Sequence, residues 1–201
     1  MTVIDMILNL AIFVITPLLL IRLWRRTRKE SPEKFRGAFR FFTCLSNIWC
    51  SLTALLTAAA EIAGNVPEWV WILKYTGTAG VAVTMLTVFL FLAPSVGKDW
   101  YDVLLKGSGN LFMHLLTPLL ALVSFCVFER RGMTFGRSLF GLLPVAVYGP
   151  LYLYQILYAP EGKRWEDFYG FNKSGKWPVS FAAMLAGTFI MCMGLMALQN
   201  L

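Results

Sequence analysis

The sequence predicts an all-α membrane protein with six transmembrane helices packed in one bundle. Hydrophobic residues make up 58% of its 201 residues and charged residues only 14%. The mean hydropathy is +0.64, outside the range of soluble globular domains. About 20 apolar residues are needed for one helix to cross a bilayer, and six such stretches are present. They use most of the chain, so residues 1–201 are expected to form a single six-helix transmembrane domain.

Each predicted span is a continuous apolar stretch of helix-forming length. The first carries Asp5 ahead of its apolar run, and its basic cluster follows that run, so it reads as a retained helix and not a cleaved signal peptide. The six spans are predicted at residues 4–24, 38–60, 69–94, 109–128, 138–158 and 178–199.

The net charge of +7 is explained by membrane orientation. Of the 18 lysines and arginines, 14 fall in the loops on one side, eight of them between Arg22 and Arg40. The positive-inside rule assigns this side to the cytoplasm of a cell-membrane protein and both termini to the other side. No nucleic-acid-binding motif accompanies the charge, so no nucleic-acid partner is expected. The bilayer itself is the expected partner, and the oligomeric state is left open.

His114 is the only histidine and lies inside the fourth span. Ionisable groups within spans are costly and usually face a cavity or a partner. Pro118 lacks the N–H that would bond the His114 carbonyl, so the helix is expected to kink and open space beside the imidazole. Asn110, one turn earlier, is placed to orient the ring or to donate to an oxyanion.

The second span carries a stripe of small and polar residues at helical spacing, expected to point into the bundle. If the spans start at 38 and 109, Thr43 and His114 each lie about 7–8 Å below the same membrane boundary. A threonine is a poor nucleophile unless a base such as neutral histidine takes its proton. The stripe consists of Thr43, Asn47, Cys50, Ala54, Thr57 and Glu61.

Thr43 as nucleophile and His114 as general base therefore form a candidate catalytic dyad. No carboxylate is visible at their depth to serve as a third member. Metal ligation is also disfavoured, because one histidine without a carboxylate at its depth cannot complete a metal site. No cofactor is expected. The candidate oxyanion donors are Ser46, Asn47 and Asn110, and the fifth span adds a polar face with Tyr148 and Tyr152.

Other roles remain open. His114 can be a buried histidine bonded to a neighbouring helix. The polar faces of the second and fifth spans can line a small transporter or proton-coupled carrier, although no internal repeat or mid-membrane carboxylate is apparent. The chain can also be a non-catalytic membrane scaffold. Lys74 is expected to pair with Glu61 or Glu68 or to snorkel. The aromatic loop Glu161–Trp177 is either an interfacial anchor or the cover of a site.

Two segments carry a family resemblance: Arg40–Asn47, which reads RFFTCLSN, and Asn110–Leu119, which reads NLFMHLLTPL. They resemble the paired motifs of the androgen-induced protein family, which includes the androgen-dependent TFPI-regulating protein. Its animal members are multi-pass membrane hydrolases of fatty acid esters of hydroxy fatty acids. The resemblance implies a lipid ester substrate, with Thr43 matching the family's catalytic threonine and His114 its histidine. The chain differs from the animal members at Ser46–Asn47 and in the spacing from His114 to Pro118, which bears on the substrate.

Overall fold

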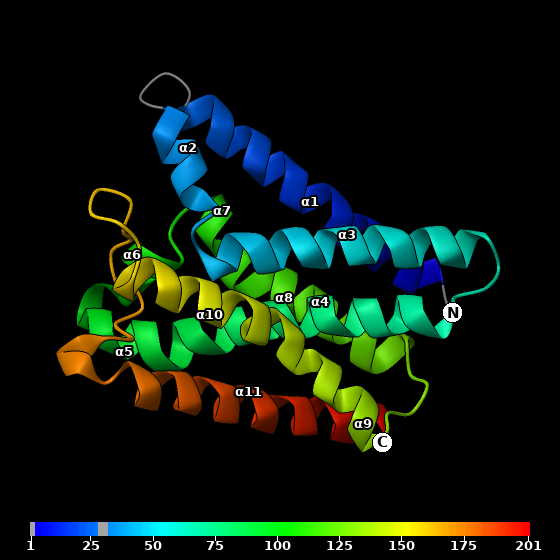
Figure 1. The fold of residues 1–201 in the computed structure, drawn as a ribbon. Coiled ribbons are helices and arrows are strands. Elements are labelled where there is room, and N and C mark those ends of the chain that lie inside the picture. Colours follow the sequence, from blue (N-terminus) through cyan, green and yellow to red (C-terminus); the bar gives the residue numbers. More distant parts are fainter. Residues whose placement is uncertain (1–2, 28–31) are drawn as a thin grey trace.

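The computed structural model describes residues 3–27 and 32–201, which contain helices and loops and no strand. Six helical segments are long and apolar enough to cross a membrane, as the hydropathy pattern predicted. The chain is thus an all-α polytopic membrane bundle (Figure 1). The six segments are Val3–Arg26, Phe42–Ile62, Glu68–Leu104, Gly109–Phe128, Phe135–Leu157 and Trp177–Gln199.

Three of these segments are uninterrupted α-helix, whereas in the third, fourth and fifth the backbone alternates between α-helix and short π or 3-10 turns. Both chain termini lie at one end of the bundle (Figure 1), here called the Lys74 end, and the opposite end is called the Thr43 end. The α-helices are α1 (Val3–Thr27), α2 (Pro32–Ala38), α3 (Phe42–Ile62), α4 (Glu68–Thr87), α5 (Ala93–Val96), α6 (Trp100–Leu104), α7 (Ser108–Leu111), α8 (Thr117–Val123), α9 (Phe135–Ser138), α10 (Leu143–Leu157) and α11 (Trp177–Gln199). The π turns are η1 (Val88–Leu92), η3 (Phe112–Leu116) and η4 (Ser124–Phe128), and the 3-10 turns are η2 (Gly97–Asp99), η5 (Leu139–Leu142) and η6 (Lys173–Gly175).

The second span begins later than predicted. The short helix α2 ends at Ala38, a turn follows, and α3 starts only at Phe42. Arg40 stays outside the span, because a charged side chain is cheaper at the boundary than within the apolar region. Thr43 therefore lies in the first turn of α3, closer to the membrane boundary than a start at residue 38 implied.

The polar stripe of α3 points into the bundle, as predicted. Asn47, Cys50, Ala54 and Thr57 are all fully buried. Much of this face packs against α4, where two glycines allow the helices to approach closely. A Cβ at Gly77 would lie against the Thr53 hydroxyl and 3.0 Å from the Cys50 backbone, while one at Gly80 would touch Ser46 at 3.4 Å. Hydrogen bonds join the same faces, with Ser46 Oγ and Thr84 Oγ1 2.8 Å apart.

Gly77→Ala is expected to destabilise the protein by about 1–3 kcal/mol, because the added methyl group forces α3 and α4 apart. Thermal unfolding in detergent micelles measures this. Gly194→Ala on α11 is the matched control, since its Cβ would meet no atom within 4 Å. Equal unfolding temperatures for the two variants would mean that the α3–α4 contact is not tight.

Two of the π turns immediately precede prolines. In η1 the Ala93 N–H bonds the Val88 carbonyl ahead of Pro94, and in η3 the Thr117 N–H bonds the Phe112 carbonyl ahead of Pro118. A proline cannot donate to the carbonyl four residues back, so the preceding turn widens to find other partners. The fourth span therefore departs from α geometry at the turn that contains His114. Both turns lie toward the Thr43 end of the bundle (Figure 1).

Candidate functional site

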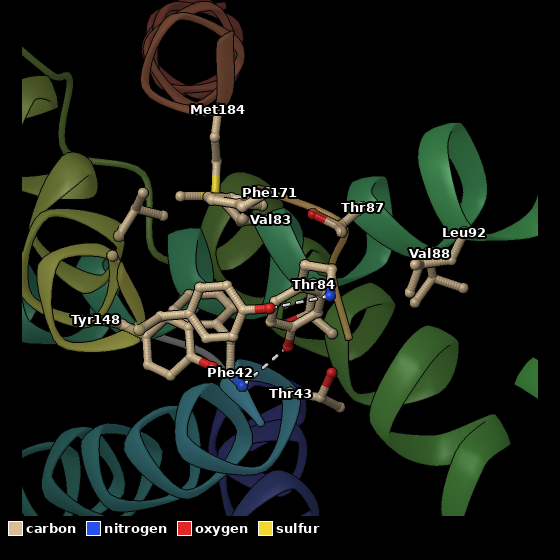
Figure 2. A pocket seen from close by; sticks show the side chains of 14 residues that line it. Phe42, Thr43, Val83, Thr84, Thr87, Val88, Leu92, Tyr148, Phe171 and Met184 are labelled. Carbon is tan, nitrogen blue, oxygen red and sulfur yellow. Dashed lines mark hydrogen bonds between the residues drawn. The ribbon is translucent and has the colours of Figure 1, made fainter. Parts of the chain in front are cut away.

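A small cavity of about 30 Å³ lies at the Thr43 end, large enough for about one water molecule. Figure 2 shows side chains from α3, α4, η1, α10 and α11 converging on it, with the Thr43 hydroxyl pointing away from its helix toward the space. The walls are mostly apolar and aromatic. They comprise Phe42, Thr43, Val83, Thr84, Thr87, Val88, Leu92, Val145, Tyr148, Gly149, Tyr152, Tyr169, Phe171 and Met184.

The start of α3 positions Thr43. Phe41 has extended backbone torsions (φ −88°, ψ 133°), so the helix starts at Phe42 and its first N–H groups have no partner within the helix. The Phe42 N–H donates to the phenol oxygen of Tyr169 at 3.0 Å. Tyr169 therefore serves as a long-range helix cap, and it stands beside the threonine that follows Phe42.

The aromatic loop after α10 closes the cavity. Asp167 accepts hydrogen bonds from the Tyr152 hydroxyl and from the backbone N–H groups of Phe171 and Asn172, each at 2.8 Å. The Tyr169 N–H in turn donates to the Tyr152 hydroxyl at 3.1 Å. These bonds fold the loop over α10 and bring Tyr169 and Phe171 into the cavity wall. Part of this loop therefore covers the cavity, as one of its two expected roles requires.

Tyr169 was not singled out from the sequence, although it lies in the aromatic run that suggested a cover. Burial raises the pKa of the Tyr169 phenol to about 12, while its hydrogen bonds with Phe42, Tyr148 and Thr43 act to lower it. The phenol therefore keeps its proton throughout the physiological pH range. Its oxygen accepts hydrogen bonds, and its O–H remains a donor in contact with Thr43.

Three of the candidate residues meet at this cavity: Thr43, Tyr148 and Tyr152. The Tyr148 hydroxyl donates to the Arg40 carbonyl at 2.6 Å, and its ring stacks on Tyr152 with centroids 5.8 Å apart. Both tyrosine hydroxyls thus donate to groups outside the cavity. Ser46 is buried one turn along α3, where its hydroxyl bonds Thr84 and the Thr43 carbonyl.

Asn47 connects α3 to the turn that carries His114. Its amide nitrogen donates to the Thr43 carbonyl at 2.8 Å and to the Met113 carbonyl at 3.1 Å. An amide NH₂ has two hydrogens, so both are used and none remains for an oxyanion. α3 and the turn η3 are therefore in contact. One side chain joins Thr43 to the residue before His114.

His114 itself bonds to the end of α6. Its Nδ1 lies 2.6 Å from the Leu104 carbonyl, and among the described residues no hydrogen bond joins the ring to Thr43. A carbonyl can only accept, so Nδ1 carries the hydrogen and Nε2 holds the lone pair of the neutral ring. Asn110 lies on the surface, donating to the Val103 carbonyl at 3.3 Å, and lines no part of the cavity.

A second polar assembly, called the Lys74 cluster, is buried toward the opposite end. Lys74 donates to Asn9 and forms an ion pair with Glu129 at 3.6 Å, so its partner is neither Glu61 nor Glu68. Glu68 instead pairs with Arg137 at 2.6 Å. The cluster contains three carboxyl groups, of which those of Asp5 and Glu129 are fully buried, where the sequence had suggested no buried carboxylate. The cluster consists of Asp5, Asn9, Glu61, Lys74, Ser124 and Glu129.

Comparison of the chain with protein-family models, with curated proteins and with solved structures found no match in any of the three. The function therefore has to be argued from the side chains and their geometry.

Proposed function

We propose that the protein is an intramembrane hydrolase of lipid esters, with Thr43 as nucleophile and His114 as general base. The observation that supports it best is the position of the Thr43 hydroxyl, in a small apolar cavity and in contact with Tyr169, whose phenol keeps its proton. Asn47 links the Thr43 backbone to the His114 turn. By the positive-inside rule the Thr43 end faces the cytoplasm and both termini lie outside it.

In the proposed reaction the Thr43 oxygen attacks the ester carbonyl carbon. Its proton passes to Nε2 of His114 through one water molecule, because the imidazole does not line the cavity. The tetrahedral intermediate then expels the alcohol, which takes the proton from Nε2. A water molecule attacks the acyl-threonine, gives its proton to Nε2, and the collapse of the second intermediate releases the fatty acid. Thr43 regains its proton from His114.

The bond from His114 to Leu104 serves this role. It holds the imidazole in the tautomer whose Nε2 is basic, as backbone carbonyls do for many functional histidines. A hydrogen bond between nucleophile and base is often long in the free enzyme and tightens only with substrate. Asn47 already holds α3 against the His114 turn.

Tyr169 is the proposed oxyanion donor. Asn47, Tyr148 and Tyr152 spend their donor hydrogens on carbonyl or carboxylate oxygens. The Tyr169 phenol lines the cavity, contacts Thr43 and keeps its proton. A neutral phenol placed there can donate to the oxygen that becomes negative in the transition state.

Covalent labelling tests the proposal. A fluorophosphonate probe added to the purified protein is expected to form a stable adduct, located by peptide mass spectrometry on Thr43. The probe imitates the tetrahedral intermediate and reacts only with an activated nucleophile. Protein that is folded yet unlabelled, or labelled elsewhere, would exclude Thr43 as the nucleophile.

Tyr169→Phe is expected to lower kcat for ester hydrolysis by about 100- to 1,000-fold, the usual loss when one oxyanion donor is removed. Between pH 7 and 10 the wild-type rate should show no decline from Tyr169, because its pKa of about 12 keeps the phenol protonated there. Tyr154→Phe, at an exposed tyrosine of α10 outside the cavity, is the matched control. Equal rates for Tyr169→Phe and wild type would remove Tyr169 from the mechanism.

One observation favours a second candidate function, proton-coupled transport. In the Lys74 cluster the carboxyl groups of Asp5, Glu61 and Glu129 lie close together, and one ammonium group, Lys74, pairs with Glu129. Buried ionisable groups of this kind mark proton paths in carriers. Proton flux into liposomes containing the protein, lost in Glu129→Gln, would support transport. Flux equal to that of protein-free liposomes would exclude it.

A further inference from the structure

A lateral groove of about 330 Å³ runs along the bundle between α3, α4 and α10. Its rim is exposed, with 72% of Val147 accessible, and its lining is almost wholly apolar. The volume lies in the range of small-molecule sites. Along α3 the groove extends from Phe42 to Trp49, about 10 Å at the rise of an α-helix. Its principal lining residues are Leu45, Trp49, Leu73, Leu143, Val147 and Leu151.

The few polar groups of the groove are already satisfied. The Trp49 indole donates to Thr76 Oγ1 at 2.8 Å, and the Thr76 hydroxyl donates to the Leu73 carbonyl at 2.7 Å. Ser46 is bonded to Thr84, as described above. No polar group is left to recognise a headgroup, so the lining matches hydrocarbon.

The groove and the Thr43 cavity share two walls, Phe42 and Tyr148. Their ring centroids are 5.2 Å apart, so only one layer of side chains separates the two spaces. A chain lying in the groove with its head toward Phe42 therefore places that head one layer of side chains away from the Thr43 cavity.

From this continuity we infer that the groove binds the acyl chain of the ester substrate, which enters sideways from the bilayer. The inference rests on the proposed function and names its substrate class: long-chain amphiphilic esters with the carbonyl near the membrane boundary. The groove lies within the membrane-spanning segments, where the surrounding molecules are acyl chains. To react with Thr43, the scissile carbonyl has to pass the Phe42 and Tyr148 rings that separate the groove from the cavity.

Two fluorophosphonates test the inference, one with a hexadecyl chain and one with an ethyl group. Leu73→Trp, which fills the floor of the groove, is expected to slow labelling of Thr43 by the hexadecyl probe about tenfold or more, since losing apolar contact for two methylenes has that effect. Labelling by the ethyl probe should not change. Leu119→Trp on the exposed face of α8 is the matched control and should change neither rate.

If Leu73→Trp slows labelling by both probes equally, the substitution has damaged the fold. Val147→Trp, at the rim of the groove, is then used as the test variant instead. If both probes label the wild type, and each groove variant slows the hexadecyl and ethyl probes by the same factor, the groove is not the acyl-chain site. The proposed hydrolase function would be unaffected by that result. Photo-crosslinking detects binding in the groove independently of any reaction at Thr43. A long-chain ester carrying a diazirine in its chain should crosslink to residues 45–49 or 143–151 and be displaced by unlabelled ester. Crosslinking only elsewhere would overturn the inference even if Thr43 reacts.

Discussion

Thr43→Ala is expected to lower the rate of long-chain ester hydrolysis by at least about 1,000-fold and to abolish fluorophosphonate labelling, because it removes the only atom proposed to attack the carbonyl. Hydrolysis of a fluorogenic long-chain ester in detergent micelles measures the rate. Thr43→Ser keeps a hydroxyl at the same position and should retain labelling. The protein should still fold, since the Thr43 backbone is held by Ser46 and Asn47.

Thr188→Ala serves as the matched control for this substitution. Thr188 is a buried threonine on α11 whose hydroxyl bonds the Met184 carbonyl, outside the Thr43 cavity. The Thr188→Ala protein should hydrolyse the ester at the wild-type rate. Thr43→Ala that unfolds like the wild type and hydrolyses at its rate would exclude the proposed nucleophile.

His114→Gln tests whether His114 acts as a base or only connects helices. A glutamine amide can still donate to the Leu104 carbonyl, but it cannot accept a proton from Thr43. We expect unchanged thermal stability and a loss of activity of about 100- to 10,000-fold, the range of general-base catalysis. Full activity with reduced stability would instead identify His114 as a helix-connecting residue.

The second large effect is expected at the Lys74 cluster. Lys74→Met should lower the free energy of unfolding by about 3–5 kcal/mol, because it leaves buried Glu129 without its cation. Both side chains are completely shielded from solvent, and Glu129 Oε2 already has no hydrogen-bond partner among the described residues. Chemical unfolding followed by tryptophan fluorescence reports the loss.

The double variant Lys74→Met with Glu129→Gln is expected to recover part of this stability, since removing both charges removes the unpaired one. Lys106→Met is the matched control, because Lys106 pairs with Asp102 at an exposed site where ion pairs contribute little. A Lys74→Met protein as stable as the Lys106→Met protein would show that the buried pair does not hold this end of the bundle together.

The six spans were predictable because crossing a bilayer imposes a length and an apolar composition that hydropathy detects directly. The buried stripe of α3 followed from helical periodicity, which puts Asn47, Cys50 and Thr57 on one face. The start of α3 was placed four residues early, because the pattern does not distinguish a short flanking helix from the span that follows it. The actual start moved Thr43 toward the membrane boundary.

The partners of individual polar groups were not predictable. Lys74 bonds Asn9 on α1 and pairs with Glu129 after η4, residues that no local spacing connects to it. Tyr169 reaches Phe42 from 127 residues away. Such contacts depend on which helices are neighbours and how each is rotated, and hydropathy carries neither quantity.

By itself, the sequence determined a six-helix membrane bundle and drew attention to Thr43 and His114, because a lone imidazole in an apolar helix is costly and a threonine of the second span lies at a similar predicted depth. Only the tertiary structure decided that α3 lies against the His114 turn, that Tyr169 lies beside Thr43, and that an apolar groove shares Phe42 and Tyr148 with the Thr43 cavity. The physical reason is that membrane insertion selects each helix separately, whereas a site forms only where several packed helices place their side chains together.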